Sequence, residues 1–77
     1  MVKYLVDYGD SASHVAEPVT FTSLYDAMKF ARRFVRESYI DRAWANIREI
    51  VNPETMPNDI CGYRNNSGQA RFINFRE

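Results

Sequence analysis

An amphipathic segment over residues 24–37 constrains the fold of this chain more than any other feature. Apolar residues recur there at the spacing of one face of an α-helix. They are Leu24, Ala27, Met28, Ala31, Phe34 and Val35. Ser23 precedes the segment and Asp26 follows three residues later, which is typical of a helix N-terminus. The sequence therefore predicts a helix over 24–37 that buries one stripe against another element.

The first part of the chain predicts strands for this helix to pack on. β-Branched and aromatic residues alternate with others over residues 2–8, which indicates a strand. Pro18 argues against a central strand nearby but allows a short edge strand over 19–21. At 77 residues the chain has room for one domain, so we expect a single domain over residues 1–77.

The stretch over residues 43–51 fits two interpretations. Its apolar residues, with Ile40 before them, match helical spacing, but their stripe lies opposite that of the first helix, so one continuous helix cannot bury both. As a strand, Ala45 and Ile47 face one side, and Trp44 and Arg48 face the other. We favour the strand, because the remaining strands need neighbours to form a sheet.

The tail predicts a hairpin, with strands over 60–64 and 69–75 joined by a turn over 65–68. The expected order is strand, short strand, helix and three strands. This order favours an α+β fold in which one helix packs on a mainly antiparallel sheet of four to five strands.

The overall charge and the apolar pattern restrict the class of protein. Ten basic and ten acidic side chains cancel, which argues against a dedicated polyanion binder. No apolar run approaches the roughly 18 residues that cross a bilayer, and the N-terminus does not resemble a secretory signal. The single cysteine, Cys61, lacks a partner for an internal disulfide and fits a reducing compartment. We therefore expect a cytoplasmic protein.

Catalytic groupings are sparse. His14 lies near Asp7, Asp10 and Glu17, but the spacing matches no known site, and a solvated loop histidine is the simpler interpretation. The three glycines are scattered and form no phosphate-binding loop. Cys61 lies in an apolar strand, which favours a buried small hydrophobe over a nucleophile. We predict no enzyme activity, no metal and no cofactor.

One grouping on the predicted helix suggests binding. Opposite the apolar stripe, an aromatic residue and four cations form a basic face. These residues are Tyr25, Lys29, Arg32, Arg33 and Arg36. A helix needs a solvated face, and cations near its C-terminus complement the dipole, so solvation alone accounts for part of the pattern. However, like charges four residues apart are unfavourable, and arginine suits bidentate contacts with carboxylates or phosphates.

A second aromatic and basic set lies in the predicted strands. It consists of Trp44, Arg48, Tyr63, Arg64, Arg71 and Phe72. Such residues form a stacking surface in nucleic-acid-binding sheets, although core packing and cross-strand pairing are the simpler explanation for most of them.

The element order and the helix opening resemble small phage-encoded α/β proteins, among them anti-CRISPR inhibitors. The shared motif is a hydroxyl residue, leucine, aspartate and two spaced alanines. It stands at Ser23, Leu24, Asp26, Ala27 and Ala31. The resemblance implies a non-enzymatic inhibitor that occupies a surface of a host CRISPR-Cas or other nucleic-acid-handling complex. It transfers no functional residue, since such inhibitors share scaffolds and not sites.

Two functions therefore remain in view. The first is the phage-type inhibitor, acting through the basic helix face or the acids around Asp7 and Asp10 on a host protein complex. The alternative is a small nucleic-acid-binding module in which the basic helix face meets phosphates and aromatic residues stack on bases. The zero net charge argues mildly against the alternative.

Overall fold

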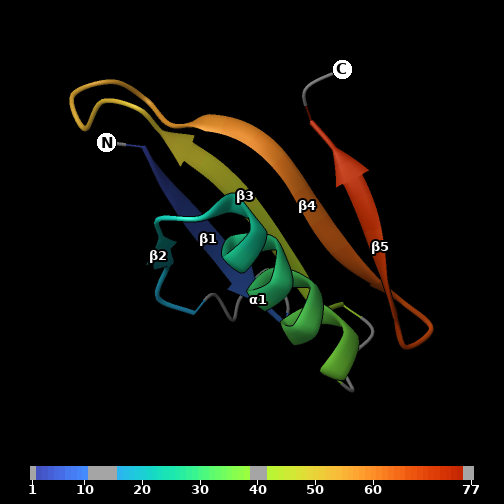
Figure 1. Ribbon diagram of the computed structural model, residues 1–77. Coiled ribbons are helices and arrows are strands. Elements are labelled where there is room, and N and C mark those ends of the chain that lie inside the picture. Colours follow the sequence, from blue (N-terminus) through green and yellow to red (C-terminus); the bar gives the residue numbers. More distant parts are fainter. Residues whose placement is uncertain (1, 11–15, 39–41, 76–77) are drawn as a thin grey trace.

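The computed structural model describes residues 2–10, 16–38 and 42–75 and places one helix on a five-stranded sheet (Figure 1). Every strand pairing is antiparallel, and the strand order is β2-β1-β3-β4-β5. The elements along the chain are β1 (Lys3–Gly9), β2 (Val19–Phe21), α1 (Leu24–Glu37), β3 (Trp44–Ile50), β4 (Asn58–Asn66) and β5 (Gln69–Asn74). The predicted α+β class and element order are confirmed.

The helix α1 begins and ends as its sequence indicates. The Ser23 hydroxyl oxygen accepts a hydrogen bond from the Asp26 amide at 3.4 Å, which satisfies one of the free donors of the first turn. The side chains that α1 buries completely are small or β-branched: Ala27, Ala31 and Val35. Because these side chains are short, the helix axis lies close to the sheet.

Within residues 43–51, Trp44–Ile50 form the central strand β3, so the strand interpretation is confirmed. Ala45 and Ile47 are buried under α1, whereas Trp44 and Arg48 lie on the opposite face, as alternation requires. The strand interpretation also predicts Val51 on the side of Ala45 and Ile47, but Val51 lies beyond the end of the strand and is exposed. Ile40 lies outside the described residues.

The hairpin is longer and its turn tighter than predicted. β4 extends through Asn65 and Asn66, and only Ser67 and Gly68 form the turn. Both turn residues have positive φ, 54° and 86°, which is the backbone of a type I′ turn. The predicted four-residue turn is wrong because Asn65 and Asn66 continue the ladder opposite Ala70 and Gln69.

Aromatic residues fill the space between α1 and the sheet on the β1–β2 side. The Tyr8 ring meets Phe30 and Phe34 edge to face, with centroids 5.1 and 4.8 Å apart, and Phe21 contacts Phe30 at 5.4 Å. Among the described residues, no element covers the other face of the sheet (Figure 1). We call that face the open face.

Candidate functional site

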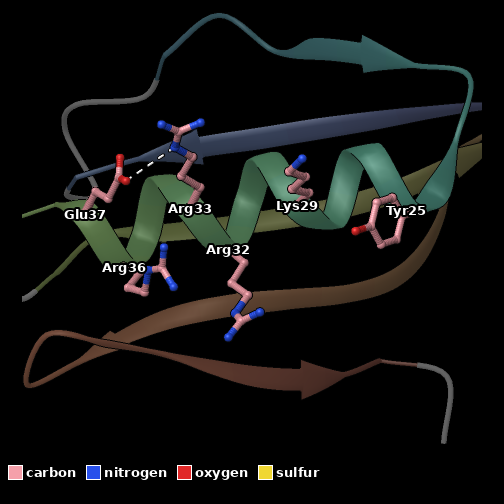
Figure 2. A pocket seen from close by; sticks show the side chains of 6 residues that line it. All are labelled: Tyr25, Lys29, Arg32, Arg33, Arg36 and Glu37. Carbon is pink, nitrogen blue, oxygen red and sulfur yellow. Dashed lines mark hydrogen bonds and ion pairs between the residues drawn. The ribbon is translucent and has the colours of Figure 1, made fainter.

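The five residues of the predicted basic face lie together on the outer side of α1 (Figure 2). With Glu37 they line an open hollow of about 360 Å³. Tyr25 is 72% exposed, and Lys29, Arg32 and Arg36 are also exposed. We name the set Tyr25, Lys29, Arg32, Arg33 and Arg36 the cationic face.

The charges of the cationic face are not equivalent. Arg33 pairs with Glu37 one turn later, with Nε and Oε1 3.3 Å apart. Glu37 therefore places an acid among the cations of this face. The like-charge repulsion expected from the sequence is thus partly relieved at Arg33. Lys29, Arg32 and Arg36 form no ion pair with another described residue. The uncompensated positive charge thus belongs to these three side chains.

The cations point to two sides of the helix. Figure 2 shows Arg33 and Lys29 on the side of β1 and β2, and Arg32 and Arg36 pointing toward β4 and β5. Arg32 lies beside Tyr63, a buried residue of β4 whose phenol is close enough to sense the charge of Arg32. The cationic face is therefore continuous with the junction between α1 and β4.

Two titratable groups near this junction are shifted by their surroundings. Burial raises the pKa of the Tyr63 phenol, Cys61 raises it further, and the nearby Arg32 opposes the rise. Tyr63 therefore stays a neutral hydroxyl at physiological pH. On the open face, burial lowers the pKa of the Arg64 guanidinium, which donates to the carbonyl oxygens of Tyr63 and Ala45 at 2.9 and 3.3 Å.

One positioning residue was not predicted. The Asn65 side-chain amide donates to the carbonyl oxygens of Val35 and Ser38, at 2.9 and 3.3 Å. These are carbonyls at the C-terminal end of α1, which the helix itself leaves without donors. Asn65 therefore fixes the last turn, and with it Arg36, against β4. From the sequence, Asn65 was expected only as part of the turn over 65–68.

The second aromatic and basic set does not form one surface. Tyr63 and Phe72 lie opposite each other on the helix-covered face, with ring centroids 5.6 Å apart. Trp44, Arg64 and Arg71 form a row across the open face instead. The sixth member, also on the open face, is Arg48. A single stacking surface is therefore not formed, and the simpler explanation, core packing and cross-strand pairing, holds for Tyr63 and Phe72.

The open face is partly neutralised by its own acids. Arg48 lies between Asp7 and Asp59, with its Nε 3.5 and 3.2 Å from their carboxylates. A bulge in the β3–β4 pairing, where Ile60 is the extra residue, brings Asp59 opposite Arg48. Asp7, which we grouped with acids around the first loop, is thus engaged with Arg48.

The structure gives the positions of some of the candidate catalytic and metal-binding groups. The described residues contain no group of three histidines, cysteines or acids that could hold a metal. Cys61 is buried in the core, as expected for a small hydrophobe. His14 lies outside the described residues. In the described part of the chain, no helix combines the length and the apolarity that crossing a bilayer requires.

Comparison with known proteins gave no match to this chain, whether to protein-family models, to curated proteins or to solved structures.

Proposed function

We propose that the chain is a non-enzymatic binding protein whose cationic face covers an anionic surface of a host nucleic-acid-handling complex in the cytoplasm. It would block that complex by occupancy, as the phage-encoded inhibitors that its sequence resembles do. A CRISPR-Cas surveillance subunit belongs to this class of partner. The observation that carries the proposal is the exposed, uncompensated charge of Lys29, Arg32 and Arg36.

Helix stability explains only part of this charge. Arg36 is in the last turn, where a cation complements the helix dipole. Lys29 and Arg32 are in the middle of α1, where the dipole gives them no such benefit. Arg32 and Arg36 are four residues apart, a like-charge spacing that costs a few tenths of a kcal/mol. Carboxylates of a partner would offset this repulsion.

The open face also carries exposed cations, Lys3 and Arg71, but the cationic face places three of them on one helix beside an exposed aromatic ring. Arg48 has two carboxylates of this chain beside it, so its charge is satisfied internally. The cationic face leaves three charges for a partner, next to the exposed ring of Tyr25. Tyrosine and arginine are among the residues that dominate the free energy of protein interfaces.

The proposal predicts that changing Arg32 and Arg36 to glutamine will weaken partner capture at least tenfold, or about 1.4 kcal/mol. Glutamine nearly keeps helix propensity and removes the charges. The matched control is Lys3→Gln with Arg71→Gln, which removes two exposed charges from the open face. Both variants and the parent are used as bait in a nuclease-treated bacterial lysate, and the captured proteins are identified and quantified by mass spectrometry.

We expect the parent and the open-face control to retain the same protein complex and the Arg32/Arg36 variant to lose it. Equal capture by all three would mean that the cationic face is only solvated. Loss in the control alone would move the interface to the open face. Capture that disappears on nuclease treatment of the parent would select the alternative, a nucleic-acid-binding module.

A further inference from the structure

A second hollow lies beside the cationic face, where α1 meets β4. Its volume is about 210 Å³, and it is lined by Tyr25, Met28, Lys29, Arg32 and Tyr63. Lys29 and Arg32 supply the charged groups, whereas the Met28 side chain and the two tyrosine rings supply apolar surface. We call it the anchor pocket.

The pocket results from an asymmetry in how α1 sits on the sheet. On the β1–β2 side, the rings of Tyr8, Phe21, Phe30 and Phe34 pack together under the helix, and the hollow outside them is lined by Phe30, Phe34, Arg33 and Glu37. On the β4–β5 side, the ring pair Tyr63 and Phe72 meets edge to face, and Phe72 remains 51% exposed. The hollow lined by Tyr63 therefore lies on the side of the helix to which Arg32 points.

The size of the pocket favours a single side chain as its occupant. Pockets for free small molecules span about 300 to 1,000 Å³, and the anchor pocket is smaller than that range. Protein interfaces, in contrast, are commonly held by one aromatic or aliphatic side chain inserted in a small pocket and surrounded by weaker contacts. The exposed rings of Tyr25 and Phe72 extend the apolar area beyond the pocket itself.

The charge around the pocket indicates which residue types should stand beside the inserted side chain in the partner's sequence. Lys29 and Arg32 belong to the pocket and to the open hollow at once, and neither pairs with another described residue. A group entering the pocket would bring its neighbours within reach of these cations. Carboxylates complement them, whereas basic neighbours would be repelled.

We infer that the anchor pocket receives one bulky apolar side chain from an acidic segment of a partner protein, with flanking carboxylates on Lys29 and Arg32. This inference rests on the proposed function and names the partner chemistry that the cationic face selects. A nucleobase has a comparable size, but single strands are held by successive stacking platforms along a basic groove. On the β4–β5 side of α1, Tyr25 and Tyr63 line this one pocket and Phe72 packs against Tyr63, so these rings form one cluster and not a row of platforms, which favours the protein segment.

The test uses four acetylated and amidated pentapeptides in a two-by-two design. The central residue is tryptophan or alanine, and the flanks are four glutamates or four glycines. Each peptide is titrated into ¹⁵N-labelled protein, and chemical-shift changes give the dissociation constant and the location. A thymidine pentanucleotide is titrated in the same way.

We expect the peptide with tryptophan and glutamates to bind at least tenfold more tightly than either single replacement. Its shift changes should centre on the amides of Tyr25, Met28 and Tyr63. A Tyr25→Ala variant should reduce its affinity about tenfold, whereas Met56→Ala, which removes another exposed apolar side chain, in the β3–β4 loop, should leave it unchanged. Because Tyr25 is exposed, its replacement should not unfold the chain.

The four peptides separate failure of the pocket from failure of the cationic face. If tryptophan and alanine between glutamates bind alike, the pocket inference is overturned while the cationic face stands. If tryptophan binds equally between glycines and between glutamates, the acidic flanks are wrong and the proposed function loses its support. If the pentanucleotide occupies the pocket more tightly than the acidic tryptophan peptide, the occupant is a nucleobase and the inference is also overturned.

Discussion

Ile47→Ala is expected to bring the chain to the edge of unfolding. Ile47 is fully buried in the central strand β3, and its removal leaves a cavity between α1 and the sheet. Such truncations cost about 2 to 5 kcal/mol. At about 0.05 to 0.15 kcal/mol per residue, a chain of this length has only about 4 to 12 kcal/mol in total. Urea unfolding followed by circular dichroism measures the loss.

Ile50→Ala is the matched control, since it makes the same change in the same strand. Ile50 lies on the open face and is partly exposed, so less apolar surface returns to water. We expect a loss of about 1 kcal/mol or less. An equal loss for the two variants would contradict the view that the core lies only between α1 and the sheet.

The second large effect is expected from Gly62→Ala in β4. A Cβ atom at this position would lie 2.8 Å from the Ala45 carbonyl oxygen and the Asn46 side-chain oxygen, and 3.0 Å from the Phe75 ring. The Ala45 oxygen belongs to the backbone of the central strand β3, so it cannot shift without disturbing the sheet. Overpacking of this kind costs about 1 to 3 kcal/mol. In a domain of this size each kcal/mol lowers Tm by about 4 to 8 °C.

Asn66→Ala controls for the effect of altering β4 itself. Asn66 is exposed at the end of the same strand. Surface changes of this kind usually stay within about 0.5 kcal/mol. Thermal melts of the two variants should therefore differ clearly, and a Gly62→Ala variant as stable as Asn66→Ala would mean that the β3–β4 pairing is looser than described.

Local patterns predicted most of the fold. The bounds of α1 follow from its periodicity and from Ser23, because caps and stripes are encoded within a few residues. For residues 43–51, the strand was favoured over the helix because the other strands need a neighbour in the sheet. The turn was misjudged because Asn65 tolerates both strand and turn, and its hydrogen bonds to Val35 and Ser38 join positions distant in sequence.

The part of the candidate site that lies on a single element could be predicted from the sequence. The cationic face follows from helical spacing alone, and its residues do lie together. The second set failed for a reason that was already present in the sequence. Tyr63 and Arg64 are consecutive in a strand, as are Arg71 and Phe72, and consecutive strand residues point to opposite faces.

The anchor pocket could not be predicted from any single segment. It depends on the distance between α1 and β4. It also depends on the side of the helix on which the aromatic residues of β1 and β2 pack. Core packing and cross-strand pairing were the simpler explanation for Tyr63 in the sequence, and it is indeed buried, but its place in the lining of the pocket was not predicted. The pocket therefore depends on packing between elements that are distant in sequence.

The two lysines of the chain provide a direct test of the central claim. Lys29 lies on the cationic face and Lys3 lies on the open face, and both are exposed. The measurement is the extent of acetylation of each lysine, determined by mass spectrometry in the free chain and in the captured complex. We predict that binding lowers the acetylation of Lys29 about fivefold or more and leaves Lys3 unchanged, since a buried amine reacts slowly. Protection of Lys3 with Lys29 still reactive would contradict the assignment of the cationic face as the binding surface.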